Sequence, residues 1–152
     1  MVQMANESTT RTGTAALANE LRPVLLRLAR ELRREIHSLG VTGGQVSLLV
    51  QIKVSPGITA SELAERERIS APGMSGHVAR LEKAGLVERT RAADRRRIGL
   101  TLTGAGEQVL VDVKRRRTAW LAAHLKNLTR DERESIEAAL PALEKLLEAP
   151  AR

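Results

Sequence analysis

Segment 88–103, ERTRAADRRRIGLTLT, decides how this chain folds. A strand-like entry leads into a turn that carries Asp94, Arg95, Arg96 and Arg97. The chain then returns through Ile98, Gly99, Leu100, Thr101 and Leu102, in which apolar residues alternate with small or polar ones. Because successive side chains of a strand point to opposite faces, this alternation is typical of a half-buried strand. The segment therefore predicts a β-hairpin with a basic tip.

Two short helices separated by a tight turn are predicted just upstream of the hairpin. Thr59 and Glu62 have the spacing of a capping box and open the first helix. Ser70 can cap the second helix, and Pro72 is tolerated in its first turn. This second helix places Met74, Val78 and Leu81 on one face. Two short helices followed by a basic hairpin indicate a winged helix-turn-helix, in which a helix enters one groove of a duplex and the hairpin tip the next.

Long amphipathic helices are expected on both sides of this region. An apolar stripe precedes it, formed by Leu17, Leu21, Leu25, Leu28, Leu32, Ile36 and Leu39. Pro23 either kinks this helix or marks its first turn, and Gly40 is placed to end it. Thr42 and Gln45 form a second capping-box pattern, which opens the helix that follows.

Two further helices follow the hairpin, the first capped by Thr103 and the second opened by Thr129 and Glu132. Pro141 should kink or interrupt the second of them. The expected fold is mainly α with a small β-hairpin wing, in one compact domain. We expect a flexible tail over 1–14, a dimerisation helix over 15–40, the winged helix-turn-helix over 41–103 and C-terminal dimerisation helices over 104–152. The winged helix-turn-helix region is too small to cover the apolar stripes of the flanking helices. We therefore expect these stripes to pack against a second copy of the chain in a two-fold dimer.

The composition favours a nucleic-acid partner, and a duplex in particular. The formal net charge is +7 and the pI is about 10.9, a balance typical of proteins that bind polyanions. The chain has one Trp and neither Tyr nor Phe. Proteins that bind single strands stack bases on aromatic side chains, so reading double-stranded DNA through phosphates and base edges fits this sequence better.

Several other classes of protein are disfavoured. Cysteine is absent, which excludes disulfides and thiolate metal sites, and His37, His77 and His124 form no metal-binding pair, so neither a metal nor a cofactor is expected. No apolar run is long enough to cross a membrane, and the polar N-terminus does not resemble a signal peptide, so a cytoplasmic location is expected. No catalytic motif is recognisable, and an enzyme is not expected.

Three segments resemble the MarR family of bacterial winged helix-turn-helix regulators. They are TASELAERERIS (59–70), GHVARLEKAGLVER (76–89) and DRRRIGLTLTGAG (94–106). The positions that match the family's pattern are Gln45, Leu81, Glu82, Gly85, Leu86, Val87, Asp94, Arg96, Leu102, Thr103 and Gly106. The resemblance is close over residues 42–106. It implies a homodimeric repressor or activator of transcription, and a small phenolic or aromatic effector that binds between the dimer interface and the winged region and weakens DNA binding; the residues that bind the effector are not identified.

Two groups of residues are predicted to contact DNA. The recognition helix would use Ser70, Pro72, Gly73, Ser75, Gly76, His77 and Arg80, and the wing would use Arg89, Arg91, Asp94, Arg95, Arg96 and Arg97. Arg96 is the expected minor-groove probe, because a guanidinium loses less hydration there than an ammonium group does, and Asp94 would orient it. Arg95 and Arg97 are expected to bind phosphates, with Arg89 and Arg91 doing likewise. A basic run at 114–117 wraps a full helical turn and is interpreted mainly as a solvated surface.

Three interpretations remain open. The first, which the family resemblance implies, is a ligand-responsive repressor that binds an inverted-repeat operator as a homodimer. The second is a basic winged-helix adaptor that binds protein or RNA without preferring an operator. The third and weakest is a small enzyme with an unrecognised site, which would need an acidic or histidine-lined cleft.

Overall fold

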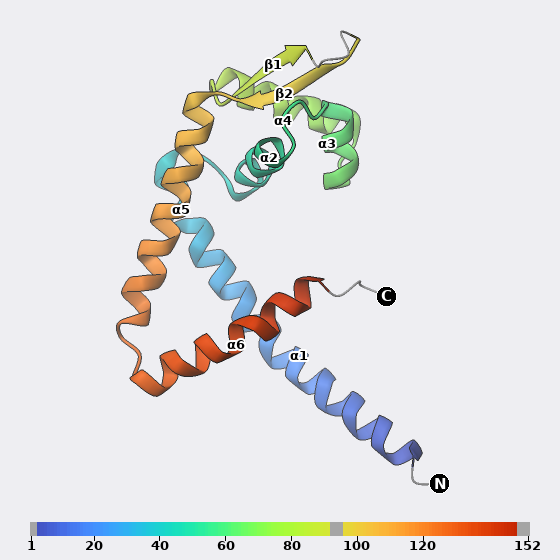
Figure 1. Cartoon of the computed structure of the whole chain (residues 1–152), viewed down its shortest axis with the longest axis vertical. Coiled ribbons are helices and arrows are strands. Elements are labelled where there is room, and N and C mark those ends of the chain that lie inside the picture. Colours follow the sequence, from blue (N-terminus) through green and yellow to red (C-terminus); the bar gives the residue numbers. More distant parts are fainter. Residues whose placement is uncertain (1–2, 92–95, 149–152) are drawn as a thin grey trace.

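The computed structural model describes residues 3–91 and 96–148, with side chains from residue 13 onward. Its elements follow the order expected from the sequence, with one short 3-10 helix in addition. They are α1 (Gln3–Arg34), η1 (His37–Leu39), α2 (Gly43–Val54), α3 (Ala60–Glu67), α4 (Ala71–Lys83), β1 (Val87–Arg91), β2 (Ile98–Leu102), α5 (Gly104–Leu125) and α6 (Arg130–Glu148). Helices α2, α3 and α4 and the two strands form a lobe at one end of the molecule, from which α1 and α5 extend, and α6 begins at the far end of α5 (Figure 1).

The predicted hairpin is present, and a third segment of chain joins it. Strands β1 and β2 pair antiparallel, with Val87 opposite Leu102 at the base and Arg91 opposite Ile98 near the tip. Leu100 also exchanges two backbone hydrogen bonds with the loop before α3, donating to Ile58 O and accepting from Gly57 N–H, both at 2.8 Å. The helix-turn-helix and the wing therefore share one small sheet.

Gly99 makes this third pairing possible. A Cβ atom at Gly99 would lie 2.3 Å from the Gly57 carbonyl oxygen, so no other residue fits there without moving the backbone. The buried face of β2 is consequently shorter than the alternation predicts. Leu100 is completely buried, whereas Ile98, which pairs with Arg91 near the tip, is 56% exposed.

One hydrophobic core holds the lobe together. The large side chains that are completely buried are Ile36, Leu49, Ile52, Leu63, Met74, Val78, Leu81 and Leu100. Met74, Val78 and Leu81 recur at steps of four and three, so a single face of α4 enters the core, as the sequence predicts. The opposite face of α4 is therefore left on the surface.

Local side-chain caps set where most helices begin. All three predicted capping boxes form, since Thr42, Thr59 and Thr129 each accept the backbone N–H of the residue three positions later at 3.2 Å. The Gln or Glu at that position accepts the threonine's own N–H at 2.8–2.9 Å. These bonds satisfy backbone donors that have no partner inside the helix.

Thr103 caps α5 as predicted and also fixes its position. Its Oγ1 accepts the Gly106 N–H at 3.1 Å and donates to the Gly85 carbonyl oxygen at 2.6 Å. A Cβ atom at Gly106 would lie 2.1 Å from the Leu86 carbonyl oxygen. The start of α5 is thus packed directly against the chain that leaves α4.

The N-terminal helix differs from its prediction at both ends. The sequence predicts a flexible tail over 1–14, whereas α1 begins at Gln3 and continues through Pro23. Extending an existing helix avoids the cost of nucleation, and no proline precedes position 23. At its other end α1 stops at Arg34, and η1 leads to Gly40, whose φ of 72° suits a glycine.

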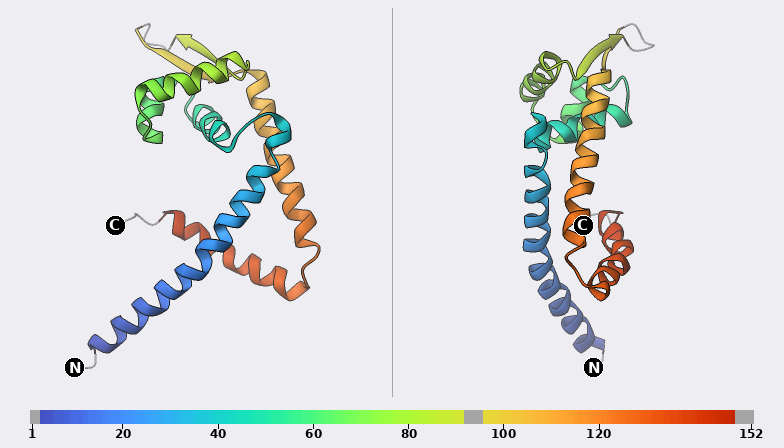
Figure 2. Two further views of the ribbon diagram at one scale, coloured as in Figure 1. Left: turned by 180° about the vertical axis from the view of Figure 1, so that it is seen from behind. Right: turned by 90° about the vertical axis from the view of Figure 1, so that its left-hand side faces the viewer.

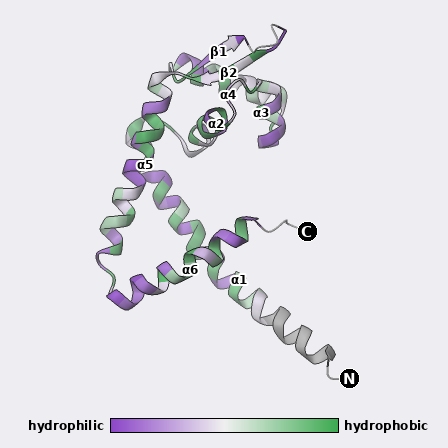
Figure 3. Ribbon diagram, viewed as in Figure 1, coloured by the Kyte–Doolittle hydropathy of each residue, from purple (hydrophilic) through white to green (hydrophobic). Residues whose placement is uncertain are grey.

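Helices α1 and α6 leave most of their apolar side chains uncovered. Figure 3 shows apolar stretches on both helices outside the lobe, and α6 has no buried residue. The large apolar side chains exposed on them are Leu17, Val24, Leu25, Leu26, Leu28, Ile136, Leu140, Leu146 and Leu147. Helix α6 also runs through Pro141 without interruption. Helices α1 and α5 leave the lobe next to each other and then diverge (Figure 2), and Arg117 Nε donates to Leu32 O at 3.5 Å where they are close.

Candidate nucleic-acid interface

Helices α3 and α4 form a helix-turn-helix. Arg68 turns the chain with a φ of 52°, and Ser70 Oγ then accepts the Gly73 N–H at 3.2 Å to start α4. On the side of α4 away from the core, Ser70, Pro72, Ser75 and Arg80 are exposed, and Gly73, Gly76 and His77 are partly covered. The structure therefore brings all seven residues predicted for the recognition helix onto its outer side or its first turn.

The two glycines of α4 have different surroundings. A Cβ atom at Gly73 would lie 3.0 Å from Ser70 Oγ and 3.1 Å from Ile69 Cγ2, so the cap itself leaves little room for a side chain. A Cβ atom at Gly76 would meet only Arg80 Nη2, at 4.0 Å. Nothing in the described part of the chain demands glycine at position 76, although glycine weakens a helix interior.

A crevice of about 190 Å³ separates the start of α2 from α4. It is lined by Thr42, Gly44, Gln45, Ser47, Leu48, Glu67, Ile69, His77 and Arg80. His77 and Arg80 thus lie beside the N-terminus of α2, where backbone N–H groups and the helix dipole favour an anion. From sequence, Thr42 was interpreted as a cap and Gln45 as a cap and a match to the family pattern, while Ser47 was not singled out. Nothing in the pattern shows that α2 begins beside α4.

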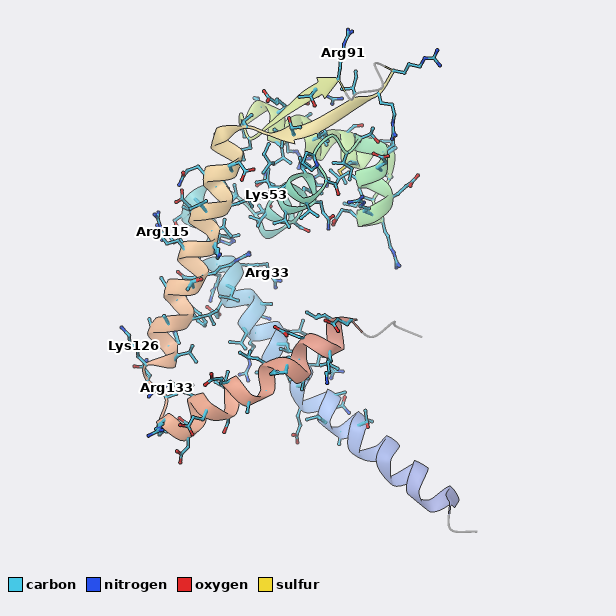
Figure 4. All side chains as sticks on the ribbon, viewed as in Figure 1. Arg33, Lys53, Arg91, Arg115, Lys126 and Arg133 are labelled. Carbon is cyan, nitrogen blue, oxygen red and sulfur yellow. The ribbon has the colours of Figure 1, made fainter. Side chains whose placement is uncertain are left out.

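The wing carries exposed arginines at the end of the lobe. Arg91 ends β1 and its side chain extends away from the lobe (Figure 4). Arg96 lies in the turn before β2 and is also exposed. Asp94 and Arg95 lie outside the described residues, so the predicted orientation of Arg96 by Asp94 stays a prediction.

Two of the predicted phosphate ligands have carboxylate partners within the lobe. Arg89 of β1 grips Glu82 of α4 with both arms of its guanidinium, through Nε to Oε1 at 2.8 Å and Nη2 to Oε2 at 3.3 Å. Arg97, next to β2, donates from Nη2 to Glu62 Oε1 on α3. The sequence alone placed both arginines in one basic cluster. Their carboxylate partners belong to other elements of the fold and cannot be recognised from the local sequence.

Glu62 is strongly stabilised as a carboxylate. The Thr59 N–H donates to Glu62 Oε2 at 2.8 Å and the Thr59 hydroxyl to the same oxygen at 3.1 Å, while Arg97 occupies the other oxygen. These bonds, that from the Thr59 backbone first and that from Arg97 second, lower the pKa of Glu62 from 4.5 to about 2. Glu62 therefore stays ionised at every pH at which the lobe is expected to bind DNA.

The remaining polar residues singled out from the sequence lie away from this surface. On α5, Trp120 and His124 stack with ring centroids 3.8 Å apart, and His124 Nδ1 lies 2.8 Å from Trp120 O. His37 is exposed at the start of η1. Within the described residues, no cluster of His, Asp and Glu could hold a metal ion, and no helix is long and apolar enough to cross a membrane.

Known proteins share both this sequence pattern and this fold. A sequence model of the MarR family matches residues 39–98. An uncharacterised HTH-type transcriptional regulator of Mycobacterium bovis is 32% identical over 126 residues, covering 82% of this chain and 88% of that protein. The HTH-type transcriptional repressor MdtR of Bacillus subtilis is 32% identical, covering 74% of this chain and 73% of the repressor.

The solved structures give the same result for the fold. The crystal structure of a transcriptional regulator protein from Pseudomonas aeruginosa PA01 superposes with a TM-score of 0.80 at 29% identity, covering 91% of this chain and 98% of that one. This match includes the end helices as well as the lobe, whereas the family model does not reach the end helices. The resemblance inferred from three short segments is thereby confirmed. This chain belongs to the MarR family and is a winged helix-turn-helix transcriptional regulator, not an enzyme.

Proposed function

We propose that the chain is a repressor that binds an inverted-repeat operator as a homodimer and is released by a small aromatic or phenolic effector. One observation supports this proposal above the others. The outer face of α4 and the arginine-bearing wing belong to one lobe, joined by a shared sheet and a shared core. A duplex can meet both at once, with α4 in the major groove and the wing tip in the neighbouring minor groove.

Each DNA-facing group has a distinct role in this proposal. Arg80 grips a guanine edge or a phosphate, while Ser70 and Ser75 donate hydroxyls to phosphates or bases. Arg96 enters the minor groove, and Arg91 and Arg95 bind phosphates beside it. Because phosphate contacts release counterions, the logarithm of the binding constant should fall linearly with the logarithm of the salt concentration.

The exposed apolar faces of α1 and α6 support the dimer. An uncovered stripe of leucines on two long helices favours burial against a second copy, and two-fold dimers are the commonest oligomers. Two copies related in this way would present two α4 helices, which suits an operator of two half-sites. The relative named a repressor, MdtR, supports the sign of regulation proposed here.

A cavity of about 540 Å³ between α2 and α5 supports an effector site. Apolar side chains form most of its wall and three cations lie among them, the full lining being Val46, Val50, Lys53, Leu110, Val111, Val113, Lys114, Arg117, Thr118 and Leu121. Arg117 also lines a second cavity of about 420 Å³ against α1. An aromatic carboxylate suits such a wall, with its ring on the valines and its charge near Arg117.

The test is a screen of duplex promoter fragments, beginning with the DNA beside the chain's own gene, by fluorescence anisotropy with and without aromatic acids such as salicylate. We expect tight binding to an inverted repeat, a steep salt dependence and release by an acid.

Arg96→Ala should weaken binding strongly while leaving the dimer folded, and unchanged affinity would reject the role given to Arg96. Equal affinity for inverted repeats and random duplexes would favour a basic adaptor instead.

A further inference from the structure

We propose that Glu62 and Arg97 form a clamp that holds the wing at its working angle on the helix-turn-helix, so that Arg97 is a positioning residue and not a phosphate ligand. This inference rests on the proposed binding of duplex DNA. It differs from the expectation drawn from the sequence, in which Arg97 was one more basic residue of the wing tip.

The first step is where the ion pair lies. Glu62 belongs to the first turn of α3, and Arg97 immediately precedes β2, 35 residues further along the chain. The backbone pairing between Leu100 and Ile58 already joins these two segments at the base of the wing. The ion pair joins them again nearer the tip, where the described strands have no backbone partner from the helix-turn-helix. Two attachments at different heights restrict tilting in a way that one cannot.

The second step is that the other strand is tied down as well. Arg89 of β1 holds Glu82 near the end of α4, so each wing strand is bound by an ion pair to a different helix. The wing is therefore fixed relative to α3 and α4 together. Because a shift of about 1 Å in a contact surface can weaken a productive geometry substantially, this angle decides whether the wing and α4 fit one duplex.

The third step is electrostatic. The Glu62 carboxylate faces Arg97, and its other oxygen is bound by Thr59. A phosphate that approached Arg97 would meet this negative charge and would have to displace it. The pair thus adds little net charge to the DNA-facing surface, and Arg97 should not contribute to counterion release.

The chain itself supplies the variant that isolates the clamp. In the equivalent capping box of α2, Gln45 uses its amide oxygen to accept the Thr42 N–H at 2.9 Å. Glu62→Gln should therefore keep the cap of α3 while removing the charge that holds Arg97. Glu65→Gln, at an exposed position of the same helix, removes an equal charge and serves as the matched control.

The experiment measures the affinity of Glu62→Gln, Arg97→Gln, the double variant and Arg97→Lys for one duplex over a series of salt concentrations, with thermal unfolding of each. Removing a negative charge should by itself strengthen binding to DNA, and Glu65→Gln reports this effect. We expect Glu62→Gln and Arg97→Gln instead to weaken binding by about fivefold to tenfold, with an unchanged salt slope. The double variant should be no weaker than either single one, and Arg97→Lys should retain most of the affinity.

Two results would overturn the clamp. If Arg97→Gln lowers the salt slope by about 0.9 and Glu62→Gln binds more tightly, Arg97 is a phosphate ligand. If both variants bind like the wild type, the ion pair has no part in positioning the wing. Wild-type protein that binds no duplex at all would instead reject the proposed function, which separates the two failures.

Discussion

At the scale of single residues, Gly76 is a glycine that the folding of α4 does not explain. It lies in the interior of α4, where glycine is less favourable than alanine by about 0.8–1 kcal/mol. A Cβ atom there would meet nothing closer than 4.0 Å within the chain, so packing does not explain the glycine. We infer that the missing side chain lets the α4 backbone lie close to the groove wall.

Gly76→Ala should therefore raise the free energy of unfolding by roughly 0.5–1 kcal/mol and weaken binding to the operator. Thermal denaturation and fluorescence anisotropy measure the two effects. Gly13→Ala is the control, because Gly13 also lies within a helix with open space around its Cα. It should leave DNA affinity unchanged. An alanine at position 76 that stabilised the protein and bound DNA equally well would mean that the glycine is merely tolerated.

Glu62 should make the stability of the lobe depend on pH in a defined window. Its pKa is lowered to about 2 in the folded chain, whereas an unfolded chain returns it to near 4.5. A lowered pKa means that the stabilisation is complete above pH 4.5 and disappears as the pH falls toward 2. The groups responsible are Thr59 and Arg97, while Arg66 of the same helix donates instead to Ser55 Oγ at 2.8 Å.

Urea unfolding of the wild type and of Glu62→Gln, at low ionic strength, measures this contribution. The difference in unfolding free energy should be largest above pH 5 and should shrink steadily as the pH falls toward 2. Arg97→Gln should leave part of the pH dependence, because the bonds from Thr59 remain. A difference that stays constant between pH 2 and 6 would show that Glu62 does not titrate as proposed.

At the scale of elements, two glycines allow neighbouring segments to touch through their backbones. Gly99 lets β2 pair with the loop at Gly57, and Gly106 lets α5 begin against the Leu86 carbonyl. Gly104 of the same helix can be compared with Gly106 directly. Gly106→Ala should destabilise the lobe by about 1–3 kcal/mol, since its Cβ would lie 2.1 Å from a backbone oxygen that cannot swing away. Gly104→Ala, two residues earlier in the same helix, meets nothing within 4 Å and should be nearly neutral. Urea unfolding measures both, and equal effects would contradict the close approach.

At this scale the sequence predicts interactions between residues that are close along the chain, but not those between distant segments. The caps at Thr42, Thr59 and Thr129 were predictable, because the donor and acceptor lie three residues apart in a recognisable pattern. The buried face of α4 followed from helical periodicity. The pairing of Leu100 with Ile58 and the Glu62–Arg97 ion pair were not predicted, because they join residues whose proximity exists only after the lobe has folded.

The same limit applies to the surface that we propose meets DNA. The outer residues of α4 could be named from sequence, since they are those left over once its apolar face is assigned. The basic wing was recognised as a cluster, but which arginines point outward depends on carboxylates from α3 and α4. The crevice between α2 and α4 could likewise not be predicted from the sequence, because no local pattern shows that the two helices lie side by side.

At the scale of the whole molecule, the exposed helices decide whether the chain can exist alone. Leu140 is 50% exposed in the middle of α6 and Leu147 is 89% exposed near its end, while the core of the lobe is buried within one chain, with Ile36 after α1 and Val113 of α5 packed into it. Each buried leucine contributes roughly 1.5–3 kcal/mol, so covering several of them by a second copy supplies ample free energy for association. The division predicts that assembly can be disrupted without unfolding the lobe.

Leu140→Glu should therefore convert the protein from a dimer to a folded monomer, which sedimentation equilibrium would detect as about half the mass. A charge at this position cannot be buried against an apolar partner without a large desolvation cost. Circular dichroism should still report a folded lobe, and affinity for a full inverted repeat should fall toward that for a half-site. Val54→Glu is the matched control: Val54 is 73% exposed but belongs to the lobe, so its variant should remain dimeric. If Leu140→Glu stays dimeric at every concentration, the apolar face of α6 is not the dimer interface, and another surface must bring the two recognition helices together.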